Sequence, residues 1–159
     1  MRQRVGIGYD IHRSAPGRPL VLGGVRFESD WGLEGHSDAD VLAHAIGDAL
    51  LGALALGDLG THFPPGDPQW KDASSLDLLA RIRALVVARG GRIVNVDATV
   101  VAEEPRILPV RDAMRARLAE ALGIGVECVS VKATTNERLG ALGRGEGVAA
   151  WAVALVEVA

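Results

Sequence analysis

The stretch VLAHAIGDALLGALALG, from Val41 to Gly57, constrains the fold more than any other part of the chain. Its apolar residues occupy nearly every face of a helix, and a helix of that kind has to be buried. His44 and Asp48 interrupt it, and it is shorter than the roughly 18 consecutive apolar residues that a membrane span requires. The stretch therefore predicts a central helix inside a protein core that ends near Gly57, and it argues against a membrane protein.

The remaining pattern predicts strands and helices in alternation. Gly23-Gly24 separates two apolar runs as the turn of a small β-hairpin would. A second helix is expected from Ser74 or Ser75 to Arg89, and a third from 110 to 122, ended by Gly123. Alternating, β-branched or partly apolar runs predict four strands: residues 4–12, 92–104, 127–135 and 147–159. Polar or proline-rich composition predicts loops at residues 31–40 and 61–70.

These elements predict an α/β fold, an α+β sandwich with a sheet on one side and helices on the other. We see no internal repeat, low-complexity tract or linker, and the length of 159 residues suits one domain over residues 1–159.

Charge and cysteine content exclude several classes of function. The net charge is −3 and the only lysines are Lys71 and Lys132, so there is no basic run of the kind that binds nucleic acid. The single cysteine, Cys128, excludes an internal disulfide and fits a reducing compartment. Arg2 and Arg4 are not followed by the apolar run of a signal peptide. We therefore expect a soluble, cytoplasmic protein without a membrane partner.

Three of the four histidines, with acidic neighbours, fall within the first 44 residues. Asp10 and His12 are two residues apart on a predicted strand, so their side chains share one face. His44 is a polar ring in an apolar helix and needs a partner. One carboxylate and two imidazoles suit zinc and would leave a fourth position open. The spacing equally allows His44 to bond Asp48 or Asp40 in the core, so both readings remain open.

Two further motifs have both a binding and a structural interpretation. Residues 132–137, KATTNE, place hydroxyl groups beside a carboxylate, which suits phosphate oxygens and a hard cation such as Mg²⁺, but equally suits an ordinary end of a strand. Residues 143–147, GRGEG, offer an arginine for an anion or a tight turn. The sequence contains no P-loop motif. Gly6 and Gly8 resemble the start of a dinucleotide-binding fingerprint, but Ile11 stands where its third glycine belongs.

Taken together, these motifs resemble the 2-C-methyl-D-erythritol 2,4-cyclodiphosphate synthase family of the non-mevalonate isoprenoid pathway. The resemblance covers essentially the whole chain. Its strings are, in order, GIGYDIH, LGGV, HSDADVLAHAIGDALLGALALGDLG, FPPGD, NVDATVVAEEPRI, VKATTNERLG and GRGEGVAA. It implies a ferredoxin-like subunit, a homotrimer with active sites between subunits, and conversion of 4-diphosphocytidyl-2-C-methyl-D-erythritol 2-phosphate to the cyclic diphosphate with release of CMP.

The resemblance also implies roles for individual residues. Zn²⁺ would be bound by Asp10, His12 and His44, and a second cation, Mg²⁺ or Mn²⁺, by Glu137. His36 and Thr135 would stabilise the transition state. The substrate would contact a larger set of residues: Ser37, Asp58, Leu59, Gly60, Phe63, Asp67, Ala102, Pro105, Arg106, Ile107, Leu108, Ala133, Thr134, Asn136 and Arg144.

The chain departs from the family pattern at three positions. Pro65 stands where an acidic residue is common in the substrate loop, although Asp67 is retained. Ala141 stands where phenylalanine often lines a central cavity of the trimer, and Asn136 replaces a frequent threonine.

Two other functions use the same residues. A hydrolase or a non-haem iron oxygenase has a similar ligand set. In a non-enzymatic trimeric binding module, the polar clusters would only stabilise an interface.

Overall fold

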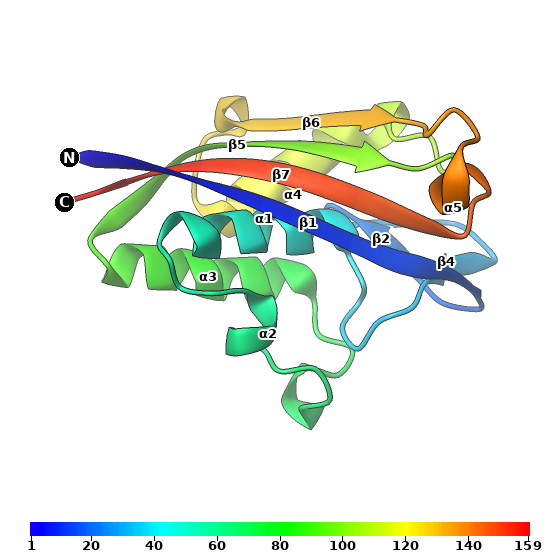
Figure 1. The fold of residues 1–159 in the computed structure, drawn as a ribbon, viewed down its shortest axis with the longest axis horizontal. Coiled ribbons are helices and arrows are strands. Elements are labelled where there is room, and N and C mark those ends of the chain that lie inside the picture. The colour runs from blue at the N-terminus through cyan, green and yellow to red at the C-terminus, as the bar shows by residue number, and fades with distance from the viewer.

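A computed structural model describes residues 1–159 as a five-stranded mixed sheet with helices on one face (Figure 1). The strands, in spatial order, are β4 (Trp31–Leu33), β1 (Arg2–Pro16), β7 (Gly147–Val158), β5 (Gly91–Val101) and β6 (Val129–Thr134). Only the β5–β6 pair is parallel; the other neighbours are antiparallel. The predicted arrangement, a sheet with helices on one side, is confirmed.

Three helices of 12 to 14 residues cover the inner face of this sheet: α1 (Val41–Ala53), α3 (Ser75–Ala88) and α4 (Arg111–Leu122). The predicted second and third helices are confirmed, and Gly123 ends α4 in a left-handed conformation. The connections contain short helical turns: α2 (Leu59–His62), α5 (Gly140–Gly143) and the 3₁₀ turns η1 (Pro68–Trp70), η2 (Leu108–Val110) and η3 (Val126–Cys128). None of the helices is long and apolar enough to span a membrane.

The predicted β-hairpin is confirmed as β2 (Leu20–Leu22) and β3 (Val25–Phe27), a separate two-stranded sheet. Gly23 and Gly24 both have positive φ, as a two-residue hairpin turn requires. Their N–H groups donate to the carboxylate of Asp40 at 2.9 and 2.7 Å, and the same carboxylate accepts a hydrogen bond from Ala43 N at the start of α1. One buried carboxylate thus ties the hairpin to the central helix; burial and the charge of Asp38 raise the pKa of Asp40 to about 6.

Three sequence predictions were wrong in detail. The region 61–70 is not all loop, because α2 reaches His62 and η1 covers Pro68–Trp70. The region 31–40 is not all loop, because Trp31–Leu33 pairs with the end of β1 as β4. A three-residue strand is too short to leave a periodic signal, and its hydrogen bonds depend on a partner distant in sequence. Helix α1 ends at Ala53, ahead of Gly57, and Ala55 already has a positive φ of 54°.

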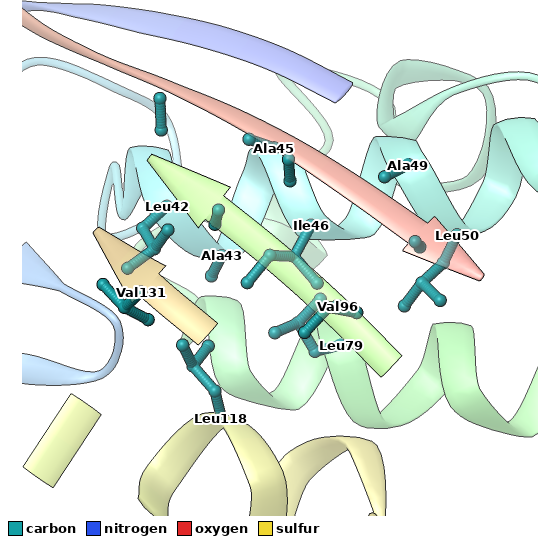
Figure 2. Close-up of a cluster of buried hydrophobic side chains, with 14 of the residues drawn as sticks. Leu42, Ala43, Ala45, Ile46, Ala49, Leu50, Leu79, Val96, Leu118 and Val131 are labelled. Atoms are coloured by element: carbon teal, nitrogen blue, oxygen red, sulfur yellow. The ribbon is translucent and has the colours of Figure 1, made fainter. Parts of the chain in front are cut away.

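The core is centred on α1, as predicted for a helix that is apolar all round (Figure 2). Leu42, Ile46 and Leu50 of this helix are 0% exposed. They belong to the same buried cluster as Leu79 of α3 and Leu118 of α4. The helices and the sheet therefore enclose one continuous hydrophobic cluster.

Two glycines bring α1 directly against β1. A Cβ atom added to Gly8 would lie 1.8 Å from the carbonyl oxygen of Ala45, and one added to Gly6 would lie 1.8 Å from that of Ala49. Only glycine permits this approach of two backbones. Asp10 and His12 follow on the same face of β1, so their side chains reach the N-terminal half of the helix.

The first and last strands lie side by side, with Arg2 paired to Val158. Both termini consequently lie at one end of the sheet, and β4 and α5 lie at the other (Figure 1). The outer face of the same two strands is apolar and uncovered. Its large exposed side chains are Val5, Ile7, Tyr9, Ile11, Trp151 and Val153.

Candidate metal centre and ligand-binding hollows

Asp10, His12 and His44 converge on one point, as the sequence predicted. Asp10 Oδ2 lies 2.9 Å from His12 Nε2 and 3.0 Å from His44 Nδ1. The two ring nitrogens are 3.2 Å apart. The strand supplies two of these side chains and the helix supplies the third, across the contact that Gly6 and Gly8 make possible.

The two histidine rings are held by their other nitrogens. His12 Nδ1 donates to the carbonyl oxygen of Glu34 at 2.6 Å. His44 Nε2 lies 2.8 Å from Ser75 Oγ and 3.1 Å from Ser37 Oγ. In each ring, one nitrogen is therefore held by a neighbouring oxygen while the other faces Asp10.

The three donor atoms fit a tetrahedral metal ion. Metal–ligand distances of about 2.0–2.1 Å place neighbouring donors of a tetrahedral zinc site roughly 3.3 Å apart. The observed separations of 2.9 to 3.2 Å are slightly shorter and need only a small expansion. One carboxylate with two imidazoles also matches the donor chemistry of a catalytic zinc site, in which three protein ligands leave one position open.

The charges of the three groups are coupled. Burial by itself would raise the pKa of Asp10, but hydrogen bonds with His12 and His44, together with their charge, lower it to about 2. Burial would lower the pKa of His12, yet the hydrogen bond with Asp10 and its negative charge raise it above the ordinary 6.5. The carboxylate therefore remains ionised and favours a positive charge beside it, whether that charge is a proton or a metal ion.

A hollow of about 370 Å³ lies over the triad. It brings together six further residues that the sequence assigned to the site: His36, Ser37, Asp58, Leu59, Gly60 and Phe63. Pro65 also lines it, where the family commonly has an acidic residue. His36 is fixed by a 2.7 Å hydrogen bond from its Nε2 to the carbonyl oxygen of Asp67. The carboxylate of Asp67 itself caps the turn η1 through Gln69 N and does not line the hollow.

Asp48, Trp70 and Leu78 also line this hollow, and none of them was predicted to do so from the sequence. Asp48 was considered only as an alternative partner of His44, which bonds Asp10 and Ser75 instead. Asp48 accepts a 2.8 Å hydrogen bond from Leu59 N, which holds α2 against α1, and burial raises the pKa of Asp48. Its position one turn after His44, on the same face of the helix, was a signal that could have found it.

A second hollow, of about 180 Å³, lies between the ends of β5 and β6. It contains seven of the residues that the family resemblance assigned to substrate contact, namely Ala102, Pro105, Arg106, Ile107, Leu108, Ala133 and Thr134. Thr135 and Glu103 line both this hollow and an adjoining one of about 650 Å³, which also holds Glu137 and Arg144. Asn136 lies beside them and donates its backbone N–H to Glu103 at 2.8 Å.

The hollow over the triad shares no lining residue with the other two. His36 lines one and Thr135 lines the others, so within this chain the two residues belong to different hollows. This separation was not visible in the sequence.

Comparison with known proteins now identifies the family. The model of the YgbB family matches residues 3–157. The chain belongs to the YgbB family. The 2-C-methyl-D-erythritol 2,4-cyclodiphosphate synthase of Thermosynechococcus vestitus is 61% identical over 157 residues, which cover 99% of this chain and 98% of that protein.

Solved structures agree with the YgbB assignment. The bifunctional IspDF of Campylobacter jejuni superposes with a TM-score of 0.95 at 38% identity, over 99% of this chain and 43% of that one. The CDP complex of Plasmodium falciparum IspF superposes with a TM-score of 0.85 at 34% identity, over 97% of this chain and 95% of that one. The resemblance noted from the sequence motifs is confirmed.

Proposed function

We propose that this YgbB-family chain is a 2-C-methyl-D-erythritol 2,4-cyclodiphosphate synthase. The observation that carries the proposal is the convergence of Asp10, His12 and His44 beneath an open hollow, in a chain 61% identical to a protein of that name. In the reaction, an oxygen of the substrate's 2-phosphate attacks the β-phosphorus. The bond from that phosphorus to the CMP oxygen breaks, and CMP leaves with the electron pair.

No nucleophile from the protein is needed, because the attacking oxygen belongs to the substrate. The task of the protein is to position two anionic groups and to neutralise their charge. A Zn²⁺ bound by the triad would act as a Lewis acid on phosphate oxygens, and a second cation, Mg²⁺ or Mn²⁺, bound by Glu137 would do the same on the diphosphate. His36 and Thr135 would donate hydrogen bonds to the oxygens that gain charge.

The cytidine end of the substrate is proposed to enter the hollow between β5 and β6. Ala102, Pro105, Ile107 and Leu108 offer an apolar wall for the base, and the backbone and hydroxyl groups of residues 133–135 offer hydrogen bonds. The CDP complex of the Plasmodium falciparum relative supports a cytidine diphosphate ligand for this fold. Asp58 and Gly60, which line the hollow over the triad, are proposed to bind the erythritol portion.

We further propose that the enzyme is a homotrimer whose active sites lie between subunits. Two observations support an intersubunit site. The hollow over the triad and the proposed cytidine hollow share no lining residue, which favours an active site that combines one hollow from each of two subunits. The outer face of β1 and β7 exposes a continuous set of apolar side chains, which is typical of an interface. Each subunit would act as a single synthase domain, residues 1–159, in the cytoplasm.

The decisive experiment is incubation of the metal-loaded protein with the substrate. We expect equimolar CMP and cyclic diphosphate, measured by ³¹P NMR. CMP with a linear product would show hydrolysis and contradict the proposal.

A pair of histidine variants tests the triad. His44→Ala should lose bound zinc and turnover together. His62→Ala is the matched control, because His62 lies outside the triad and bonds the carbonyl oxygen of Leu56 at 2.8 Å. Turnover by His44→Ala close to that of His62→Ala would remove the metal from the mechanism.

A further inference from the structure

Ser75, the first residue of α3, connects His44 to a carboxylate behind it. Ser75 is 1% exposed, and its hydroxyl lies 2.8 Å from His44 Nε2. The same hydroxyl forms a short hydrogen bond to Asp38 Oδ1. Asp38, Ser75 and His44, which we call the relay, thus form a continuous hydrogen-bonded series that ends at the triad. From the sequence, Ser75 was expected only as a possible start of a helix, and Asp38 had no predicted role.

The direction of each hydrogen bond in the relay is fixed by Asp38. A carboxylate only accepts, and its other contacts are also with donors: Oδ2 accepts from Ser75 N at 3.1 Å and Oδ1 from Asp40 N at 3.1 Å. The Ser75 hydroxyl must therefore donate its hydrogen to Asp38. Its oxygen is then free to accept a hydrogen from His44 Nε2.

A proton held on Nε2 leaves the lone pair of His44 on Nδ1. That is the nitrogen that faces Asp10 and His12 at 3.0 and 3.2 Å. A metal ion needs this lone pair, and an acceptor on the far nitrogen both orients the ring and increases its basicity. His12 is held in a similar way but without an intervening hydroxyl group, since its Nδ1 donates directly to a carbonyl oxygen.

We propose that Asp38 and Ser75 are positioning residues for metal binding, which act through His44 and do not touch the metal or the substrate. The proposal deepens the proposed function and rests on the metal site described there. Ser37 is a weaker alternative acceptor: its Oγ is 3.1 Å from His44 Nε2, accepts from Ala39 N at 3.3 Å, and has no carboxylate behind it. Loss of Ser75 should therefore weaken the site without abolishing it.

The test compares Ser75→Ala and Asp38→Asn with Ser74→Ala. Ser74 is the adjacent serine, and as the residue before α3 it makes no capping bond with its side chain. Zinc affinity is measured by competition with a chromophoric chelator, and the Co²⁺ absorption spectrum reports the geometry of the site. Loss of such a partner weakens metal binding by about 10- to 100-fold. We expect a loss of that size in both relay variants and wild-type affinity in Ser74→Ala.

Two additional measurements separate the relay from a structural effect. The double variant should lose little more affinity than either single variant, because the two residues act as one unit. Thermal unfolding of the chelator-treated proteins shows whether the substitutions damage the fold itself; the proposal requires that the affinity loss persist in variants whose metal-free melting temperature matches wild type.

The outcomes for the relay and for the metal site are distinguishable. Wild-type zinc affinity in Ser75→Ala, or additive losses in the double variant, would overturn the relay while leaving the metal site intact. Failure of the wild-type protein to bind one zinc per subunit would instead overturn the metal site itself.

Discussion

The two faces of β1 and β7 show how one pair of strands serves two purposes. The inner face of β1 carries Gly6 and Gly8, which let the backbone of α1 approach closely. The outer face carries large side chains, with Ile7 opposite Val153 and Tyr9 opposite Trp151 at a ring-centroid distance of 4.7 Å. Strands that are apolar on both faces are typical of sheets covered on both sides. In this chain the helices cover only the inner face.

The difference indicates what each face is built to contact. At Gly6 and Gly8 the inner face contacts the backbone of α1 directly, so there is no room for a side chain at these two positions. In the homotrimer that we propose, the outer face would contact another subunit; in the single chain its side chains are 41 to 69% exposed. Substitutions on the inner face should therefore lower the stability of the fold, whereas substitutions on the outer face should weaken assembly.

The largest effect is expected from Gly8→Val on the inner face. Its Cβ would meet the carbonyl oxygen of Ala45, which belongs to a backbone that cannot move aside alone. We expect a loss of more than about 3 kcal/mol, beyond the usual range for overpacking, measured by urea denaturation. Zinc binding should fall as well, because His44 would be displaced from Asp10.

Gly52→Ala is the control for this glycine effect. An added Cβ there meets nothing nearer than 3.9 Å, so the higher helix propensity of alanine should stabilise the subunit by about 0.5–1 kcal/mol. Equal destabilisation by both substitutions would contradict the close-approach argument.

The next effect is the loss of inner-face packing in Ile46→Ala. Ile46 is fully buried in the core cluster, and its truncation leaves a cavity (Figure 2). We expect a cost of about 2–5 kcal/mol in the free energy of unfolding. Val87→Ala, at a position that is 59% exposed, should change it by less than about 0.5 kcal/mol.

The smallest effect on the subunit's own stability, and the largest on its assembly, is expected from Ile7→Glu. Ile7 is 69% exposed, so in an isolated subunit the substitution should change the unfolding free energy by less than about 0.5 kcal/mol. Burying the new charge in an interface is costly, so analytical ultracentrifugation should show dissociated subunits and activity should fall. Val87→Glu, on the helical side, should leave assembly unchanged; an intact oligomer with Ile7→Glu would exclude this face as the interface.

Patterns among residues that are close in sequence predicted much of the fold. The apolar run after Asp40 predicted a buried helix, and Gly23-Gly24 predicted a hairpin, because these signals depend on residues that are neighbours in sequence. Strand β4 and helix α2 were missed, since each is three or four residues long and is held by distant partners, β1 and Asp48.

The three candidate metal ligands could be predicted from the sequence, but the residues that hold them in place could not. The spacing of Asp10 and His12 placed both on one strand face, and the polar ring of His44 required a partner. The relay depends instead on the start of α3 meeting the loop before α1, a contact fixed by hydrogen bonds from Asp72 N to the carbonyl oxygen of His36 and from Asp38 N to that of Ala73. No local pattern encodes that meeting.

The adjacent termini have a practical consequence for fused or tagged forms of the enzyme. The relative from Campylobacter jejuni is a bifunctional protein of which this chain covers 43%. A further catalytic module ahead of Met1, or an affinity tag after Ala159, would leave from the end of the sheet opposite α5 (Figure 1). Attachment at either end would therefore leave the hollow of about 650 Å³ that holds Glu137 and Arg144 unobstructed, and the two fusion orders should be equally compatible with turnover.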